Sequence, residues 1–363
     1  MSDFFNLKAQ YKFIERSLKK DLLPFLSKQN FILGHETLIL EKKLSNYIGS
    51  KYCISCANGT DALTIALLAL DLKKNSEVLI PAFNYISSSE VCLLLGYKPV
   101  FVDVNNRYQI DIIDLEKKIS SKTKVIIPTS LFGRCCDYKN ILKIAKKNNL
   151  FVIEDGAQSF GAKNSDDKRS CNVFDISCTS FFPTKPLGCY GDGGAIFTNN
   201  KKLFNSMKMI SRHGQKGTFN HLNIGVNSRL DNLQSYFLLK KLKLFNKEIK
   251  NRMANYKKLL EVLSIYDDLV VNRLDKNEIS SCAIFPILYK KRDKLIRHLN
   301  NDKVPTRIYY PKPIYNHPPY KKFANSCYNT EKITKTIFSI PFSPYLNDKY
   351  FYKLNKSLKN FFD

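Results

Sequence analysis

Apolar and polar residues follow two different rhythms along the chain. Over residues 5–48 apolar side chains recur at helical spacing, as in Leu38 to Ile48, and the segment Ile32-Leu33-Gly34 forms a break between predicted helices. From about residue 51 to 200, short apolar runs alternate with amphipathic stretches. This alternation predicts βαβ units, and therefore an α/β fold with a mostly parallel central sheet and helices on both faces.

The individual elements of this sheet can be placed from the same pattern. The predicted strands are short apolar runs: Tyr52 to Ser55, Glu77 to Ile80, Pro99 to Val104, Lys124 to Pro128, Phe151 to Glu154, Ile176 to Phe181 and Ala195 to Thr198. The predicted helices lie between strands: Asp61 to Leu72, Ser87 to Leu95 and Tyr138 to Asn148. Ligands of open α/β sheets bind at the carboxyl ends of the strands, so functional residues are expected there.

A second, smaller domain is expected toward the C-terminus. A stretch rich in Leu and Lys, without Pro or Gly, runs from Asp231 to about Leu263 and predicts one long helix leaving the large domain. At 363 residues the chain exceeds what one hydrophobic core usually fills. We therefore expect a large domain over residues 1–245, including the helical entry segment, and a small α+β domain over residues 246–363.

Composition and charge narrow the class of protein. Hydrophobic residues make up 44% and charged residues 25% of the chain, as in globular proteins. The formal charge of +26 favours anionic partners such as nucleotides, nucleic acid or acidic lipid. Lysines are scattered in pairs rather than forming one tract, and no recognisable nucleic-acid-binding motif accompanies them, so we expect no nucleic-acid partner.

Cysteines and apolar runs bear on the cellular compartment. Ten cysteines in a chain of this length, several inside apolar runs, favour reduced thiols over a disulfide scaffold. Residues 1–30 lack the apolar core of a signal peptide, and no run of eighteen apolar residues predicts a membrane span. A cytoplasmic location without membrane association is therefore expected.

The most specific stretch of chemistry-bearing residues is Cys178-Thr-Ser-Phe-Phe-Pro-Thr-Lys-Pro-Leu-Gly188, followed by Gly191-Asp-Gly-Gly194. A lysine at the end of a buried strand, beside Ser and Thr hydroxyls and Gly-rich loops, is suited to form a Schiff base with pyridoxal 5'-phosphate (PLP). Lys185 is the candidate. Taken alone, a lysine in so lysine-rich a chain is far more often a surface residue in a loop.

Asp155 ends another predicted strand, in Phe151-Val-Ile-Glu-Asp-Gly-Ala-Gln158. PLP requires an acid beside its pyridine nitrogen so that the ring stays protonated and accepts electrons. Asp155 fits this role, although an Asp after a strand is often a helix cap or turn residue.

A turn between a strand and an apolar helix, Ala57-Asn-Gly-Thr-Asp-Ala-Leu63, predicts a phosphate site. Free backbone N–H groups at a helix start, together with a hydroxyl, bind phosphate. Gly59 and Thr60 would hold the cofactor phosphate, assisted by Ser180. A Gly-Thr turn alone is weak support, since any such loop can contain it.

Taken together, these motifs resemble those of the DegT/DnrJ/EryC1/StrS family of sugar aminotransferases, over almost the whole chain. The motifs that carry the resemblance occur in this order: Asn58-Gly-Thr-Asp-Ala-Leu, Pro81-Ala-Phe-Asn-Tyr85, Glu154-Asp-Gly-Ala-Gln158, Ser180-Phe-Phe-Pro-Thr-Lys185 and Gly225-Val-Asn-Ser-Arg-Leu-Asp231. Within the family the segments around residues 52–63 and 180–194 are most similar to bacterial enzymes acting on UDP-2-acetamido-2-deoxy-3-oxo-glucuronate. The resemblance implies PLP-dependent aminotransferase fold type I.

The resemblance also implies roles for single residues. Lys185 would be the Schiff-base lysine, Asp155 the partner of the ring nitrogen, Gln158 a contact on the ring-hydroxyl side and Tyr85 the aromatic ring stacked on the cofactor. Asn227 would reach the cofactor phosphate of a neighbouring subunit, which implies a homodimer with shared active sites.

The resemblance also implies which residues contact the substrate, but the sequence departs from the family pattern at one of them. Arg229 would meet the anionic part of the substrate. Tyr309 and Tyr310 would also contact it, although relatives commonly carry a His-Tyr pair where this chain has Tyr309-Tyr310. That departure weakens the expectation of a contact to a glucuronate carboxylate at this loop.

The activity implied is transfer of an amino group from L-glutamate to a UDP-linked keto-sugar, for bacterial surface polysaccharide such as O-antigen. Alternatives are an aminotransferase for a 4-keto nucleotide sugar, a catalytically silent regulator on the same scaffold, or a sugar dehydratase, in which His replaces the lysine and which Lys185 therefore argues against. Cys53 and Cys56 form a Cys-x-x-Cys pair that could indicate redox chemistry or zinc. Because it is a single pair leading into the phosphate turn, no metal site is predicted.

Overall fold

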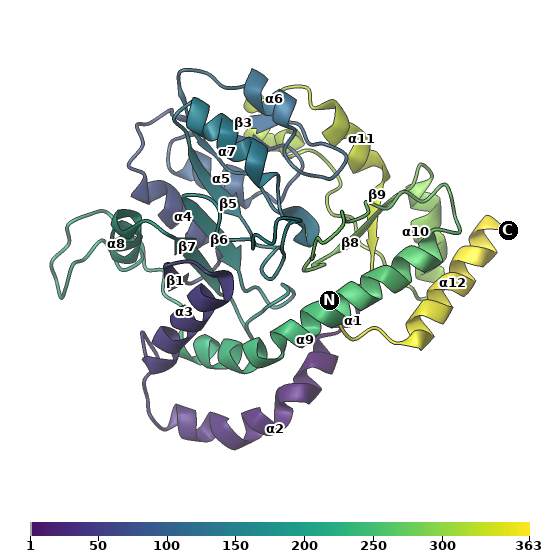
Figure 1. Cartoon of the computed structure of the whole chain (residues 1–363), viewed down its shortest axis with the longest axis horizontal. Helices are drawn as coiled ribbons and strands as arrows, with labels where there is room; N and C mark the ends of the chain where they lie inside the picture. Colours follow the sequence, from purple (N-terminus) through teal and green to yellow (C-terminus); the bar gives the residue numbers. More distant parts are fainter. Residues whose placement is uncertain (1) are drawn as a thin grey trace.

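The computed structural model describes residues 2–363 and contains one large and one small sheet surrounded by helices (Figure 1). The α-helices are α1 (Ser2–Phe5), α2 (Leu7–Leu26), α3 (His35–Ile48), α4 (Gly59–Ala69), α5 (Ser87–Leu94), α6 (Ile112–Lys117), α7 (Tyr138–Lys147), α8 (Lys201–Ile210), α9 (Asn232–Leu263), α10 (Arg292–Asn301), α11 (Tyr328–Thr336) and α12 (Asp348–Phe362). Short 3-10 helices are η1 (Leu131–Gly133), η2 (Ile314–Asn316) and η3 (Pro318–Phe323).

The large sheet has seven strands in the order β1-β7-β6-β5-β4-β2-β3. They are β1 (Tyr52–Cys56), β2 (Glu77–Pro81), β3 (Lys98–Val102), β4 (Thr123–Ile126), β5 (Phe151–Asp155), β6 (Ile176–Ser180) and β7 (Gly194–Thr198). Strands β3, β2, β4, β5 and β6 pair in parallel, whereas β7 pairs antiparallel with both β6 and β1. The carboxyl ends of all strands except β7 therefore lie at one edge of the sheet.

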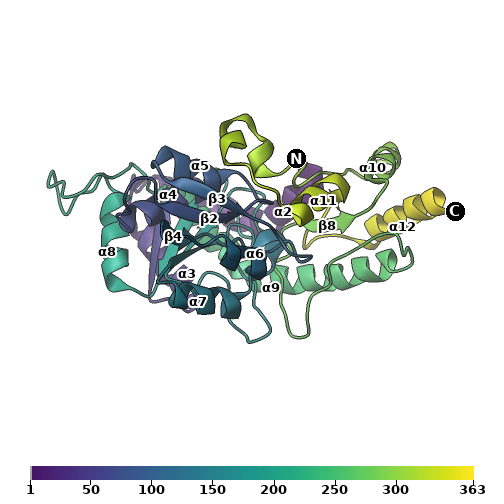
Figure 2. The same cartoon turned by 90° about the horizontal axis from the view of Figure 1, so that it is seen from above.

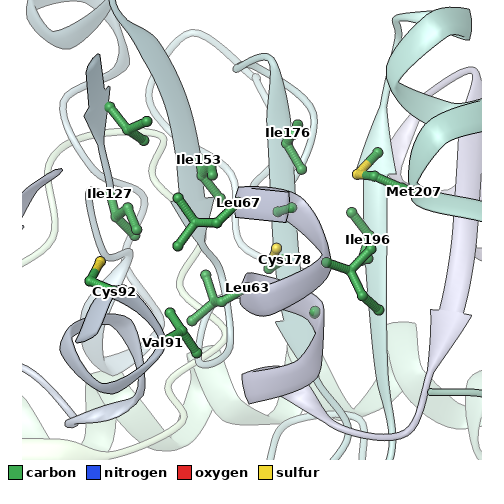
Figure 3. Close-up of a cluster of buried hydrophobic side chains, with 14 of the residues drawn as sticks. Leu63, Leu67, Val91, Cys92, Ile127, Ile153, Ile176, Cys178, Ile196 and Met207 are labelled. Atoms are coloured by element: carbon green, nitrogen blue, oxygen red, sulfur yellow. The ribbon is translucent and has the colours of Figure 1, made fainter. Parts of the chain in front are cut away.

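Helices cover both faces of this sheet (Figure 2). On one face α4, α5 and α8 pack against alternate strand residues, and the resulting core is drawn in Figure 3. Leu63 and Leu67 of α4 lie in its centre, between Ile153 and Ile176 of the sheet and Val91 of α5. On the other face α3 and α9 cover β1 and β7, and α6 and α7 cover β2, β4 and β5. Residues that alternate along each strand thus serve two different cores.

A small antiparallel sheet, β8 (Phe285–Leu288) with β9 (Ile337–Ile340), forms a separate hydrophobic core together with α10, α12 and the end of α9. α9 is one continuous helix of 32 residues that contributes to this core and to the core that covers β1 and β7. The domain boundary at residue 245 stays a prediction, and it falls inside this helix.

The predicted fold class is confirmed: the sheet is mostly parallel and helices cover both of its faces. The sequence pattern did not identify α6, α8, α11 or β9. α6 and β9 have six and four residues, so few apolar positions establish their periodicity, whereas α8 and α11 are about as long as α7 and α5 and were overlooked. Among residues 2–363 no helix has the length and apolar character needed to cross a membrane.

Candidate active site

The carboxyl ends of the strands surround a cavity of about 640 Å³. Nine of the predicted site residues line it: Gly59, Thr60, Tyr85, Asp155, Gln158, Ser180, Lys185, Tyr309 and Tyr310. They come from loops after β1, β2, β5 and β6 and from a loop of the C-terminal region. Sequence segments up to 250 residues apart, such as those of Gly59 and Tyr309, therefore meet in one site.

The start of α4 lies against the end of β6 at the cavity. Asn58 caps the helix, and its side-chain oxygen accepts a hydrogen bond from the Asp61 amide at 2.8 Å. A Cβ at Gly59 would lie 2.8 Å from the Ser180 Cβ, so only glycine lets the two segments approach this closely. The Thr60 hydroxyl is 3.0 Å from the Ser87 hydroxyl. Backbone N–H groups and three hydroxyls thus converge where the helix dipole favours an anion.

Lys185 and Asp155 lie together in the cavity, and burial acts on both. Burial lowers the pKa of the Lys185 amine, and the Asp155 carboxylate opposes this effect. Burial raises the pKa of the Asp155 carboxyl, while a hydrogen bond from the Ala157 amide, the charge of Lys185 and a hydrogen bond from Asn84 lower it. The amine is therefore more easily deprotonated than that of a surface lysine, and the carboxylate has a nearby cation and donors that favour its charge.

Gln158 connects the floor of the cavity to the C-terminal loop. Its Oε1 accepts a hydrogen bond from the Phe132 amide at 2.9 Å, and its Nε2 donates to the Tyr310 hydroxyl at 3.2 Å. The Tyr310 ring lies 6.2 Å from the ring of Tyr85, which is 58% exposed at the rim. Tyr309 packs edge-on against Phe4 of α1, with 6.4 Å between ring centroids. The rings of Tyr85, Tyr309 and Tyr310 therefore form an aromatic part of the cavity lining.

Asn227 and Arg229 do not line this cavity. They line a neighbouring hollow of about 470 Å³, of which Asp192 is the one residue shared with the cavity. Asn227 is exposed, and Arg229 takes part in none of the ion pairs found in residues 2–363. The structure thus brings together nine of the eleven predicted site residues and places the other two next to them.

Residues 13–359 match the model of a protein family described as the "DegT/DnrJ/EryC1/StrS aminotransferase family". The chain belongs to this family. It is 42% identical over 351 residues to the UDP-2-acetamido-2-deoxy-3-oxo-D-glucuronate aminotransferase of Pseudomonas aeruginosa, covering 96% of both chains. It is 34% identical to a pleiotropic regulatory protein of Geobacillus stearothermophilus, covering 95% of this chain and 94% of the relative. A solved DegT/DnrJ/EryC1/StrS aminotransferase from Brucella abortus superposes with a TM-score of 0.94 at 34% identity, covering 99% and 98% of the two chains.

Membership of the DegT/DnrJ/EryC1/StrS family confirms the predicted resemblance and the predicted enzyme class, a transaminase. The ten cysteines of this aminotransferase are all unpaired and buried. Burial raises the pKa of both Cys53 and Cys56, which disfavours the thiolate needed for redox or zinc chemistry.

Several lining residues of this aminotransferase were missed by sequence reasoning: Phe5, Asn84, Ser87, Thr129, Thr184 and Asp192. Asn84 and Thr184 stand inside the quoted motifs, so a reading of every polar position there would have found them. Phe5 lies on α1, far from every motif, and no local signal marks it.

Glu154, next to Asp155, is another residue whose role the sequence did not indicate. It is fully buried, and its carboxylate accepts hydrogen bonds from Ser130 at 2.6 Å, Ser170 and the Cys171 amide at 2.9 Å, and Tyr138 at 3.0 Å. Burial raises its pKa, and these donors oppose the shift. Its network fixes the strand that ends in Asp155.

Proposed function

We propose that this aminotransferase moves the amino group of L-glutamate onto a UDP-linked 2-acetamido-3-keto sugar, most specifically the 3-oxo-glucuronate. The observation that carries the proposal is the pairing of a half-buried lysine with a buried carboxylate beside the start of α4, in a chain 42% identical to an enzyme named for that substrate. Its product would serve bacterial surface polysaccharide synthesis.

The cofactor of this family is PLP, and the residues present fit it. The start of α4 with Thr60 and Ser180 would bind the phosphate, and Asp155 would face the ring nitrogen. The close approach of Gly59 to Ser180 leaves the backbone amides open to the phosphate. When bound, PLP supplies an electron sink that makes the α-proton of an amine removable.

Lys185 would perform two tasks. Its Nζ binds the cofactor covalently, and when displaced it accepts the proton from the α-carbon of glutamate and later gives a proton to the accepting sugar carbon. The lowered pKa of the Lys185 amine favours the neutral form that would bind the cofactor and accept the proton, and the ammonium form produced by that step would be the proton donor. Asp155 would hold a negative charge in the same cavity, and Tyr310, bound by Gln158, would restrict the position of the reacting groups.

Charge supports a site shared between two copies of the chain. The cavity must accept a phosphate, the two carboxylates of glutamate and a nucleotide diphosphate. Among the described residues that line it, however, Lys185 is the only cationic side chain, against Asp61, Asp155 and Asp192. Arg229 and Asn227 lie in the adjoining hollow. We infer that these two residues complete the site of a second copy, with Arg229 pairing with a carboxylate or phosphate.

The test is turnover with glutamate and a set of keto-sugars, following 2-oxoglutarate release. The UDP-linked 3-oxo uronate, its neutral 3-keto analogue and a 4-keto sugar are compared at equal concentration. Fastest turnover of the uronate is expected, and faster turnover of the 4-keto sugar would refute the assigned position.

Arg229→Lys refines the substrate assignment. It should raise KM for the uronate about tenfold while changing KM for the neutral analogue little, because the planar two-pronged contact is lost and the charge stays. Equal effects on the two substrates would show that Arg229 does not bind the uronate carboxylate.

Regulation without catalysis is a second candidate, favoured by the 34% identity to a pleiotropic regulatory protein. A protein that binds PLP at Lys185, as shown by its visible absorbance, but converts none of the keto-sugars would favour this candidate. Any turnover above that of a Lys185→Ala variant would exclude it.

A further inference from the structure

A buried lysine on α9 contacts the turn that carries Lys185. The Lys241 side chain is 1% exposed, and its Nζ donates a hydrogen bond to the Gly188 carbonyl at 2.7 Å. The same Nζ lies 3.9 Å from the centre of the Tyr190 ring. Lys241 takes part in none of the ion pairs of residues 2–363. Burying a cation without a carboxylate partner in an ion pair is costly, so we asked what the contact between Lys241 and Gly188 contributes to the protein.

The turn that Lys241 contacts is tightly closed. The Cys189 amide donates to the Phe181 carbonyl at 2.7 Å, which joins the two ends of the turn. Inside it, the Lys185 amide donates to the Phe182 carbonyl at 2.8 Å. A Cβ at Gly188 would lie 2.6 Å from the Pro183 carbonyl oxygen, so the chain passes itself without room for a side chain. A shift at Gly188 would therefore move the residues around Lys185.

α9 holds the next residues of the same segment as well. The Tyr190 amide donates to Gln234 Oε1 at 2.9 Å, and Gln234 Nε2 donates to the Tyr190 carbonyl at 3.2 Å. Phe237 packs edge-on against the Tyr190 ring, with 4.9 Å between centroids. Gln234, Phe237 and Lys241 are spaced three and four residues apart, so they lie along one side of the helix. Residues 188–190 are thus held along two turns of α9.

We propose that Lys241 is a positioning residue for Lys185: by holding the Gly188 carbonyl from α9, it keeps the turn over residues 181–189 closed and the Lys185 amine buried. The proposal rests on the proposed function in one respect, namely that Lys185 is the lysine that binds PLP. Burial lowers the pKa of the Lys185 amine, and the neutral amine is the nucleophile. A looser turn would admit water to this amine and return its pKa toward the ordinary value.

Lys241→Met tests the proposal because methionine keeps the length and apolar contacts of the side chain and removes the donor. Lys243→Met, an exposed lysine on the same helix, is the matched control. The full chain is freed of PLP, and the rate at which it binds added PLP covalently is measured from pH 6 to 10 by visible absorbance. For Lys241→Met the midpoint of this profile should rise by about one pH unit, with a rate at neutral pH roughly tenfold lower. Lys243→Met should match wild type.

Hydrogen exchange of the peptide containing residues 181–190 gives a second measurement, and it should be faster in Lys241→Met than in Lys243→Met. If Lys241→Met does not fold, Gln234→Ala is used in its place, because it removes the two hydrogen bonds to the Tyr190 backbone. It should also raise the midpoint of the pH profile of PLP binding. An unchanged midpoint with unchanged exchange in a folded variant would overturn the proposal. Borohydride reduction of the wild-type protein distinguishes failure of the proposed function from failure of the role of Lys241. PLP found on a lysine other than Lys185 would refute the proposed function. PLP found on Lys185, together with a wild-type pH profile in the folded variant, would refute only the role of Lys241.

Discussion

Lys241 makes the stability of this aminotransferase depend on pH in a way that can be worked out from its burial. Burial lowers the pKa of its amine from the ordinary 10.5 to about 8 in the folded chain. Between these two values the unfolded chain binds more protons than the folded chain, so the free energy of unfolding rises with pH. At 1.36 kcal/mol per pH unit, the burial of the charge costs the folded state about 3 kcal/mol below pH 8, and this cost disappears above pH 10.5.

Lys241→Met removes the titrating group, so the difference in unfolding free energy between wild type and variant should change with pH. At pH 7 the charged amine costs the wild type about 3 kcal/mol relative to the neutral amine, whose hydrogen bond to Gly188 contributes about 0.5–1.5 kcal/mol, so the variant should be the more stable protein by about 2 kcal/mol. Between pH 7 and pH 10 the unfolding free energy of the wild type should rise by about 2–3 kcal/mol relative to that of the variant.

Urea unfolding of both proteins at pH 7, 8, 9 and 10, with saturating PLP throughout, measures this change. Only titrations that the substitution leaves unchanged cancel in the difference, so the series is repeated without PLP to separate the titration of Lys241 from any change in PLP binding. Lys243→Met, which alters an exposed lysine, should show a constant difference from wild type. A difference between wild type and Lys241→Met that stays constant from pH 7 to 10 would refute the reasoning, because it would mean that the buried amine keeps its ordinary pKa.

Three further predictions concern the proposed chemistry. Lys185→Ala should abolish covalent PLP binding and turnover, and peptide mapping after borohydride reduction of the wild type should find the label on Lys185 and nowhere else. Asp155→Asn should leave PLP bound but slow both half-reactions roughly 100-fold, because the ring nitrogen loses its anionic partner; rates near wild type would exclude that role. Mixing inactive Lys185→Ala chains with an inactive Asn227→Ala variant should restore activity in heterodimers, and absence of rescue despite demonstrated subunit mixing would indicate self-contained sites.

The sequence predicted the large sheet well because its strands are short, apolar and separated by helices of clear periodicity. Lys185 and Asp155 could be proposed as site residues for the same reason: Asp155 ends such a strand, Lys185 follows another, and parallel strands bring their carboxyl ends to one edge. Tyr309 and Tyr310 could be placed only through the family resemblance, because nothing local indicates that a loop of the C-terminal region reaches this edge. The contact between Tyr309 and Phe4 joins segments about 300 residues apart, which no local pattern encodes.

The burial of Lys241 could have been inferred from its position in the apolar pattern of the predicted helix. It stands among exposed lysines in a Lys-rich stretch, and by residue type alone it resembles them. Its phase differs, because it follows Leu238 by three residues and precedes Phe245 by four, and both of these are fully buried. A charged residue on the apolar side of a helix must find a polar partner or destabilise the fold, so its phase alone should have raised the question of what it binds.

The position of Lys241 on α9 also bears on how the two cores are connected. Leu238, Phe245 and Ile249 pack into the core beneath β1 and β7, whereas Tyr256 and the residues that follow pack into the core of the small sheet. The helix therefore changes from one core to the other between residues 249 and 256, without a break in its backbone. The N-terminal part of the same helix holds residues 188–190, so a tilt of α9 that moved the small sheet would also be transmitted to the segment around Lys185. Tyr309 and Tyr310 precede β9 of the small sheet and line the same cavity as Lys185, so a displacement of this sheet would act on the cavity through that loop as well.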